Sequence, residues 1–599
     1  MGKITFRNFA FLLHFTLLLL PFILSYDEIS INDVSENMWN GLNVEGIGRS
    51  EFAGDFNGDG LMDLVLGSFT SQPNSDTVSS VYLIFGTESN LVSLPSLTSL
   101  NGQNGVEFQS NLTSPWLGFD VFGLGDLNND GFDDIGISSF CDASDEANGT
   151  IPPISSASYV VYGRDSFATS PVILGNNIST FDQMTTIFHS TLSCPFRQIR
   201  NAGHFLSSNI PSSTSENLDV IISSPWEQSV YLLHNSNFEI QENHVIDLSS
   251  FTLDDDITSF TIPSVGQGSS TRYLGWGLNC VGDVNDDGFD DIGIALIDPS
   301  NPPESLVYVL FGSDSSWTSQ SSYDLTTDLN SPTNGLIFST SGSPSLFFGY
   351  SLQSVGDFNG DGIDDFGVTA STIFIDTYQN QQQIVENKNG WGEIIFGRSN
   401  WGGYIEEVTG HVNVDSLSNS SLLIQEQQFV DYNNSLNTGG MGISLSALGD
   451  VDGDGFSDVG FGLPLGCPRS INSCTMGITK IVVGSSSFNL EFVRWINIYG
   501  NENDVYFGAE LSSLPYPPSS SSSFFNSSME TNGSFSNSIA IGAPFGDSSN
   551  GEVFLVQDLI SILSTFSPTP TPPHFLDDDN NNNDDDGNSL KRFLKIIFL

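Results

Sequence analysis

Short apolar segments separated by polar turns run along most of the chain. Residues 64–70, LVLGSFT, follow an acidic turn and alternate like a strand. Other apolar segments end in glycine, as in VYLIFG at 81–86 and VYVLFG at 307–312. The pattern predicts an all-β protein built from short strands.

The strands recur in a fixed order. A glycine-containing segment such as residues 274–283, LGWGLNCVGD, leads into an acidic turn, and a second strand follows. After a variable loop comes a third strand, and then a fourth, weaker one, as at 105–110 and 335–340. Four short strands in each repeat are typical of a propeller blade. A solenoid is the alternative, but its repeats are mostly shorter, about 20–45 residues.

The acidic turn has a composition that suits a metal ion. In GDFNGDGLMDLVLGS, residues 54–68, oxygen-bearing side chains stand at every second position, and a glycine allows a sharp bend. Such a ladder predicts a cage for Ca²⁺, which takes roughly 6–8 oxygen ligands. An EF-hand needs a bidentate Glu at its twelfth position, where this chain has Leu66. An ordinary Asn-Gly or Asp-Gly turn is the alternative for any single copy.

Five copies of this frame keep the same register, with Gly at the sixth place and Asp at the ninth, which favours calcium over an ordinary turn. We expect about five structural Ca²⁺ ions. The predicted ligands, the fourth in each set acting through its backbone carbonyl, are Asp55, Asn57, Asp59, Leu61 and Asp63; Asp126, Asn128, Asp130, Phe132 and Asp134; Asp283, Asn285, Asp287, Phe289 and Asp291; Asp357, Asn359, Asp361, Ile363 and Asp365; and Asp450, Asp452, Asp454, Phe456 and Asp458.

The spacing of the copies predicts two further repeats without a cage. The first ligands fall at residues 55, 126, 283, 357 and 450, and the second interval is about twice the others. Inside it, residues 217–234 keep Asp219 and two strands but lack the ladder. Residues 536–556 again have strands without the acids. Seven repeats predict a seven-bladed β-propeller over residues 26–560, with calcium loops in five blades.

Charge restricts the possible partners. The chain has 71 acidic and 15 basic residues, a net charge of −56. No basic patch of useful size can be assembled, so nucleic-acid binding is excluded. Five Ca²⁺ ions would leave the protein strongly acidic, which favours cationic ligands or counter-ions.

The two ends of the chain differ from the repeats. Residues 1–25 have the layout of a secretory signal peptide, basic residues before a short apolar run, with an uncleaved anchor as the alternative. Residues 561–590 form a Pro/Thr-rich and Asp/Asn-rich linker, and 591–599 a short basic and apolar tail. The tail is too short to span a bilayer, so we expect no transmembrane span. Two alternatives remain for the tail: contact with a membrane surface, or a weak lipid-anchor signal.

Glycosylation sequons and cysteines agree with secretion. Seven sequons stand at Asn111, Asn148, Asn177, Asn419, Asn433, Asn526 and Asn532, some of them chance matches in a Ser-rich chain. Among the five cysteines, Cys467 could pair with Cys474 and Cys141 with Cys194. We expect Cys280 to be buried and free.

The repeats resemble a known family. Phe348-Gly349 and Phe507-Gly508 before the second strand, Gly542-Ala543-Pro544 after it, and a DxDxDGxxD cage between such positions are similar to the FG-GAP repeats of the integrin α-subunit β-propeller. The resemblance covers residues 27 to 560. It implies cages on the face away from the main ligand-binding surface, an extracellular protein or glycan ligand, and possibly a partner subunit. The leg domains, membrane helix and cytoplasmic tail of integrin α-subunits have no counterpart in this sequence.

No catalytic constellation is visible in the sequence. The paired acids Asp133-Asp134 and Asp290-Asp291 point to opposite faces of a strand, so we expect one to be a cage ligand and the other to be solvated. There is no G-x-S-x-G or H-E-x-x-H motif, and the seven histidines are scattered. Four tryptophans could line a carbohydrate surface but are better explained by packing between blades: Trp116, Trp226, Trp276 and Trp391.

Two functions are compatible with these motifs. The first is a secreted or cell-surface, calcium-binding propeller that acts as a ligand-binding or cell-adhesion module. The alternative is a secreted hydrolase or lyase that acts on glycans or glycolipids and uses the propeller as a scaffold. The first is favoured, because a separate catalytic domain or a clustered acid/His site is not visible.

Overall fold

In the residues that the structure describes, nearly all regular structure is β-strand. The only helices in the described part of the chain are short 3₁₀ segments: η2 (Leu97–Ser99), η3 (Pro225–Glu227), η4 (Asn235–Phe238) and η6 (Val414–Ser416). The computed structural model describes residues 26–30, 35–40, 45–70, 79–87, 95–110, 116–140, 157–167, 170–174, 184–189, 196–206, 218–238, 244–252, 255–263, 272–299, 305–313, 316–329, 332–340, 346–376, 381–384, 390–405, 410–417, 420–425, 429–430, 436–437, 442–451, 454–464, 477–485, 495–500, 510–513, 538–543 and 552–557. Within these ranges, no helix has the length and apolar character needed to cross a membrane.

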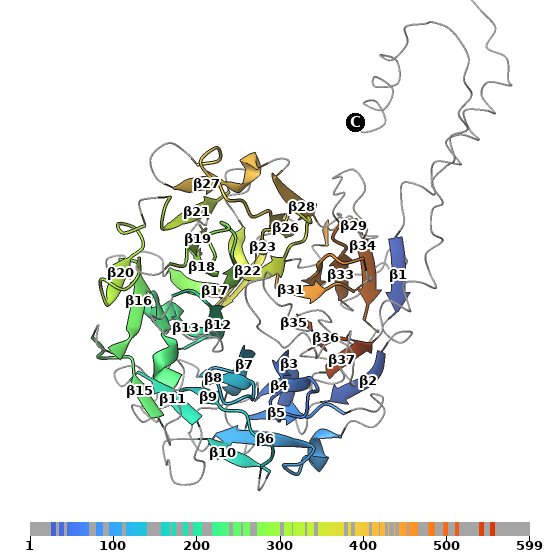
Figure 1. The fold of residues 1–599 in the computed structure, drawn as a ribbon. Helices are drawn as coiled ribbons and strands as arrows, with labels where there is room; N and C mark the ends of the chain where they lie inside the picture. Colours follow the sequence, from blue (N-terminus) through green and yellow to red (C-terminus); the bar gives the residue numbers. More distant parts are fainter. Residues whose placement is uncertain are drawn as a thin grey trace, which may run out of the picture.

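The described strands form five five-stranded and two four-stranded sheets, arranged radially, and two further two-stranded hairpins (Figure 1). We number the sheets 1 to 7 in chain order and give their strands from the innermost outward. Sheet 1 contains β3 (Glu45–Gly54), β4 (Asp63–Thr70), β5 (Ser80–Ile84), β6 (Gly105–Ser110) and β10 (Val172–Leu174). Sheet 2 contains β7 (Trp116–Gly125), β8 (Asp134–Phe140), β9 (Ser158–Val161), β11 (Met184–Phe188) and β15 (His244–Asp247). Sheet 3 contains β12 (Ile199–Gly203), β13 (Asp219–Ser224), β14 (Ser229–Leu233), β16 (Ile257–Thr261) and β20 (Ser322–Asp324).

The second half of the chain continues the same order of strands. Sheet 4 contains β17 (Tyr273–Gly282), β18 (Asp291–Ile297), β19 (Leu306–Leu310), β21 (Gly335–Ser339) and β27 (His411–Asn413). Sheet 5 contains β22 (Phe347–Gly356), β23 (Asp365–Ser371), β26 (Trp391–Ile395) and β28 (Ser421–Gln425). Sheet 6 contains β31 (Ser444–Gly449), β32 (Asp458–Leu463), β33 (Ile478–Val482), β34 (Trp495–Tyr499) and β1 (Tyr26–Ser30). Sheet 7 contains β35 (Glu510–Ser513), β36 (Ser538–Ala543), β37 (Glu552–Gln557) and β2 (Ser35–Asn40).

The innermost strands close a ring around a central axis. Each contacts the innermost strand of the next sheet in the order β3, β7, β12, β17, β22, β31 and β35, and β35 contacts β3 again. The view in Figure 1 looks along this axis. Closure of this kind leaves few free strand edges. The all-β prediction is confirmed, and the arrangement is a β-propeller.

The two ends of the propeller sequence meet in sheets 6 and 7. Strand β2 pairs antiparallel with β37 and is the outermost strand of sheet 7. Strand β1 pairs parallel with β34 on the outside of sheet 6. Chain segments more than 400 residues apart are therefore joined by backbone hydrogen bonds, which the local strand pattern could not indicate.

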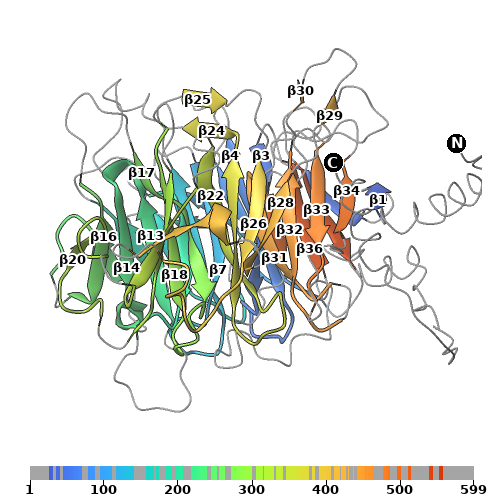
Figure 2. The ribbon, with the colours of Figure 1, turned by 90° about the horizontal axis from the view of Figure 1, so that it is seen from above.

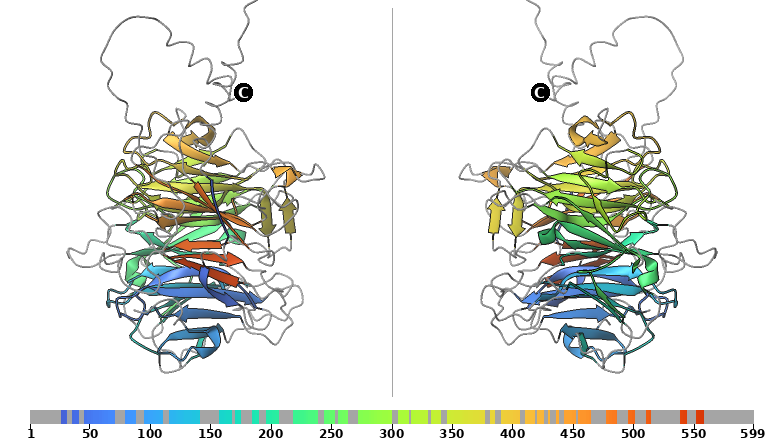
Figure 3. Two further views of the ribbon diagram at one scale, coloured as in Figure 1. Left: turned by 90° about the vertical axis from the view of Figure 1, so that its right-hand side faces the viewer. Right: turned by 90° about the vertical axis from the view of Figure 1, so that its left-hand side faces the viewer.

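Two small hairpins project from one face of the ring (Figures 2 and 3). One is β24 (Ile373–Asp376) with β25 (Gln381–Ile384), between the second and third strands of sheet 5. The other is β29 (Phe429–Val430) with β30 (Leu436–Asn437), between sheets 5 and 6. In an antiparallel meander, successive turns lie at opposite edges. The loops between first and second strands therefore lie on the other face.

The core lies between sheets, where aliphatic and aromatic side chains from neighbouring sheets interdigitate. Val65 and Leu83 of sheet 1, for example, share one buried cluster with Ile137 of sheet 2. Trp276 is buried and packs against Tyr350 of sheet 5, with ring centroids 6.0 Å apart. Trp391 is also buried. For Trp276 and Trp391, the prediction of packing in the propeller core is therefore confirmed, and the alternative of a carbohydrate-binding surface is not.

Several predicted features lie outside the described residues. They are the signal peptide, the linker and tail after residue 557, all seven sequon asparagines, Phe507-Gly508, and Cys141, Cys194, Cys467 and Cys474. Cys280 is free, as predicted, but it is only partly buried.

Candidate metal centres and the contacts around them

The five predicted cages all occupy the same place in their sheets. Each joins the first strand to the second, on the face opposite the two hairpins. We call them the five acidic loops: residues 55–63, 126–134, 283–291, 357–365 and 450–458, in sheets 1, 2, 4, 5 and 6. All their residues are described except 452 and 453, so the predicted ligand Asp452 lies outside the structure.

Within each acidic loop, the first aspartate organises the turn. In sheet 1, the Asp59 N–H donates to Asp55 Oδ1 at 2.9 Å, and the Gly60 N–H donates to Asp55 Oδ2 at 2.8 Å. Asn57 Oδ1 accepts from the Asp59 N–H at 3.0 Å, and Asp59 Oδ1 accepts from the Leu61 N–H at 2.9 Å. The side chains of Asp55, Asn57 and Asp59 therefore all accept hydrogen bonds from backbone amides of their own turn.

The other four loops repeat this arrangement. The first aspartate accepts from the amides of the fifth and sixth loop residues at 3.0 and 2.8 Å for Asp126, 3.0 and 2.8 Å for Asp283, 2.9 and 2.9 Å for Asp357, and 2.9 and 2.7 Å for Asp450. The same two contacts therefore recur in five separate sheets that share the sequence frame. Gly60 and its equivalents supply the positive φ that the bend requires, as at Gly60 with φ +81°.

The donor set of the loops fits a calcium ion. Its side chains offer only carboxylate and amide oxygens, which a hard cation prefers. Burial raises the pKa of Asp63 well above its usual range, and the charges of Asp59 and Asp55 raise it further. A cation would relieve this repulsion. In the structure these carboxylates accept hydrogen bonds from backbone amides, and the described residues contain no group of three or more His, Cys, Asp or Glu arranged to hold a metal ion.

The ninth-position aspartate also accepts two backbone hydrogen bonds that were not predicted from the sequence. Asp63 is fully buried, and its Oδ2 accepts from the Phe56 N–H at 3.0 Å. Its Oδ1 accepts at 2.8 Å from the N–H of Gly86, which follows the third strand. The same pair of contacts is made by Asp134, Asp291, Asp365 and Asp458. The glycine that ends each third strand was the available signal for this contact.

Asp219 in sheet 3 makes the same contacts without a ladder. Its Oδ2 accepts from the Leu206 N–H at 3.0 Å, and its Oδ1 accepts from the Asn235 N–H at 3.1 Å. Burial raises the pKa of Asp219 to about 7. The ninth-position aspartate therefore ties the sheet together whether or not an acidic loop is present.

The aspartates at the eighth position were predicted to be solvated, and this prediction is wrong. Asp133 and Asp290 are only 8% and 4% exposed, and the equivalent Asp364 is 1% exposed. Asp133 Oδ2 accepts from the Asp55 N–H of sheet 1 at 2.6 Å. Asp290 Oδ2 accepts from the His204 N–H of sheet 3 at 2.8 Å, and burial raises the pKa of Asp290 to about 6.

We call Asp133, Asp290 and Asp364 the inter-sheet carboxylates, because each accepts a hydrogen bond from a backbone amide of the preceding sheet. Asp364 Oδ2 accepts from the Asp283 N–H of sheet 4 at 3.2 Å. At the start of the second strand both faces of the sheet pack against protein, so Asp133 and Asp134 are both buried. The alternation rule correctly separated the two aspartates but did not identify what lay on the second face.

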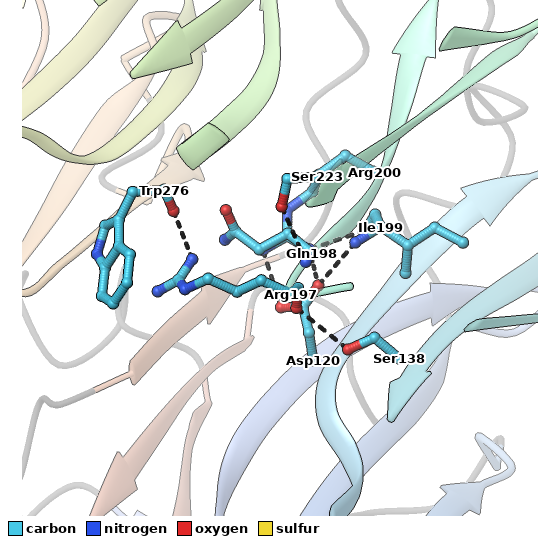
Figure 4. A network of polar contacts seen from close by, with 8 residues as sticks. All are labelled: Asp120, Ser138, Arg197, Gln198, Ile199, Arg200, Ser223 and Trp276. Atoms are coloured by element: carbon cyan, nitrogen blue, oxygen red, sulfur yellow. Dashed lines mark hydrogen bonds and ion pairs between the residues drawn. The ribbon is translucent and has the colours of Figure 1, made fainter. Parts of the chain in front are cut away.

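A second polar region surrounds the axis of the ring. A cavity of about 120 Å³ is lined by residues of all seven innermost segments, among them Glu51, Asp120, Arg197 and Arg200. Figure 4 shows how the two arginines of sheet 3 reach its neighbours. Arg200 pairs with Asp120 of sheet 2. Arg197 donates to the Trp276 carbonyl of sheet 4, and its guanidinium carbon lies 4.3 Å from the centroid of the Trp276 ring.

Comparison of the sequence with protein-family models gives no match, and comparison with curated proteins gives none either. The fold and the loop geometry are therefore the basis on which a function is proposed for this chain.

Proposed function

We propose that this protein is an extracellular, calcium-binding propeller of the integrin-α FG-GAP type, in which sheets 1 to 7 are seven blades. The observation that supports the proposal is the repeated geometry of the five acidic loops, in which the first aspartate makes the same amide contacts on one face of a closed ring. Calcium in these loops is structural.

Secretion is supported by the predicted signal peptide at the N-terminus and by the calcium concentration that the loops would need. Extracellular calcium is abundant, and sites in extracellular modules bind it with Kd values of about 10⁻⁴–10⁻³ M. Tyr26, the first residue after the predicted signal peptide, also begins β1. Cleavage after Ser25 would leave every described strand in the mature chain.

The working surface in this proposal is the face opposite the acidic loops. The acidic loops are alike in length, whereas the connections on the other face range from the Pro225–Glu227 turn to the two projecting hairpins. Variable connections on a rigid scaffold are where recognition usually resides. We propose that a protein or glycan ligand binds there as part of an adhesion function, and that calcium acts on binding only by holding the sheets in place.

Engineered N-glycans test this assignment of faces. One set of variants carries a sequon in the β24–β25 or β29–β30 hairpin, and the matched set carries a sequon on the acidic-loop face. The readout is binding of the purified, glycosylated protein to cell surfaces and to glycan arrays. We expect only the hairpin glycans to block binding. Blocking by the acidic-loop glycans alone would reverse the assignment, and turnover of a bound glycan would favour the hydrolase or lyase alternative.

A further inference from the structure

We propose that Asp133 and Asp364 are positioning residues for calcium loops that belong to the preceding sheet. Asp133 of sheet 2 serves the loop that begins at Asp55 in sheet 1, and Asp364 of sheet 5 serves the loop that begins at Asp283 in sheet 4. The inference rests on the proposed calcium binding and adds a coupling between neighbouring sheets to it.

The contact is made to the backbone of the first ligand. The Asp55 N–H donates to Asp133 Oδ2 at 2.6 Å, and the Asp133 N–H donates back to the Asp55 carbonyl at 3.1 Å. The Asp283 N–H donates to Asp364 Oδ2 at 3.2 Å. The backbone of the first ligand is thus fixed from outside its own loop, at the residue whose carboxylate organises the turn.

The space around this contact leaves little freedom. The glycine before each first ligand has positive φ, +81° at Gly54 and +78° at Gly282. A Cβ on Gly54 would lie 2.1 Å from Asp133 Oδ2, and one on Gly282 would lie 2.5 Å from Asp364 Oδ2. The glycine of the GD pair is therefore required by the carboxylate of the next sheet as well as by its own turn.

A fixed first ligand matters for the ion. Calcium affinity depends on ligand charge and on the rigidity of the site. Partners that orient a metal ligand without touching the metal typically change affinity 10–100-fold when they are removed. Each inter-sheet carboxylate supplies a hydrogen-bond acceptor from a buried carboxyl group beside the preceding sheet.

The chain contains a matched control for this effect. Asp290 makes the same contact to sheet 3, where His204 stands in place of the first ligand and no ladder follows. Asp290 also precedes Asp291, just as Asp133 precedes Asp134. Asp290→Ala therefore removes an inter-sheet carboxylate at the same position of its own loop, without removing a contact to a calcium loop in the preceding sheet.

The experiment measures bound calcium in the full chain across a range of buffered free calcium, by native mass spectrometry. We expect Asp133→Ala to weaken one ion by about ten-fold or more and Asp290→Ala to weaken none. Asp133→Asn keeps an acceptor oxygen and should recover most of the lost affinity, which separates the hydrogen bond from the charge. Asp364→Ala is the independent second case if Asp133→Ala does not fold.

Double variants identify which ion is affected. Asp59→Ala removes the sheet 1 ion, so Asp133→Ala should have no further effect in that background. Asp130→Ala removes the sheet 2 ion, and there the effect of Asp133→Ala should persist. The inference is overturned if Asp133→Ala and Asp364→Ala leave all affinities unchanged, or if they act on their own loops. A wild-type protein that binds no calcium would instead overturn the proposed function itself.

Discussion

Sheets 3 and 4 are neighbours with the same strand order, yet only sheet 4 has an acidic loop. Both have a positive-φ glycine at the end of the first strand, Gly203 and Gly282, and both have a buried ninth-position aspartate with two amide contacts. The frame of the sheet therefore does not depend on the ladder. In the proposed function, the ladder adds a calcium site to a frame already held by carboxylate–amide contacts.

Sheet 3 has polar contacts near the axis that tie it to both neighbours. Arg200 pairs with Asp120 on one side, and Arg197 stacks on Trp276 on the other. Arg197 and Arg200 are 8% and 9% exposed, so water competes little for these contacts. We interpret them as metal-independent contacts that hold sheet 3, which lacks an acidic loop, against both of its neighbours in the ring.

The largest expected effect comes from removing calcium altogether. At a free calcium concentration of 100 times the Kd, each bound ion adds about 2.7 kcal/mol to the free energy of unfolding, and about five ions contribute. Excess chelator should lower the melting temperature by more than about 10 °C and open the acidic loops to protease before the hairpin segments. Calorimetry with and without chelator, with magnesium present as a control, measures this. Unchanged thermal unfolding would contradict a structural role for calcium.

The next effect separates the frame from the ion. Asp219→Ala leaves the buried Leu206 amide and the partly buried Asn235 amide without their acceptor, and should destabilise the protein by about 2–4 kcal/mol. Calcium stoichiometry should not change. Asp291→Ala in sheet 4 is the comparison, because it should lose similar stability together with one ion. Urea unfolding and metal analysis on both variants distinguish the two roles, and loss of an ion from Asp219→Ala would contradict the separation.

A smaller effect is expected for substitutions within one ladder. Asp287→Ala and Asp361→Ala each remove a carboxylate that is exposed at the surface of its loop, and each should abolish one ion and leave the others bound. The loss of stability should be about 1–3 kcal/mol. Metal analysis of the purified variants gives the count. A wild-type protein with two or fewer ions would rule out five equivalent sites.

The pH dependence of sheet 3 is smaller again and has a definite sign. Burial raises the pKa of Asp219 to about 7, above the usual value for an aspartate in an unfolded chain. Its contribution to stability is therefore complete near pH 4 and is lost as the pH rises towards 7. Asp219→Asn cannot ionise, so its stability relative to wild type should improve as the pH rises over this range. Unfolding in excess calcium at several pH values measures the difference in stability between Asp219→Asn and wild type. A difference that does not change with pH would contradict a raised pKa for Asp219.

The comparison of sheets 3 and 4 also shows what the sequence could and could not predict. The ladder, the strand order and the extra repeat at Asp219 were predicted because each depends on residues close together in the chain. The buried state of Asp133 was missed because it depends on Asp55 in another sheet. The pairing of β1 with β34 was missed for the same reason, since no local pattern encodes a partner so distant in sequence.

The smallest expected effect concerns a loop that lacks an inter-sheet carboxylate. The eighth position of the sheet 6 loop is Ser457, which is fully buried and whose hydroxyl has no hydrogen-bond partner among the described residues. Gly356 at the end of β22 has φ +64°, like the glycines that face Asp133 and Asp364. Ser457→Asp should therefore place an acceptor beside the Asp357 amide of sheet 5 and tighten calcium binding there by about two- to five-fold, less than the loss expected on removing a native carboxylate. Ser457→Asn supplies an acceptor without the charge and should give part of this gain. Calcium titration of both variants measures the gain in affinity, and the gain should vanish when Asp361→Ala is added. The experiment therefore tests the coupling between sheets by adding a carboxylate instead of removing one.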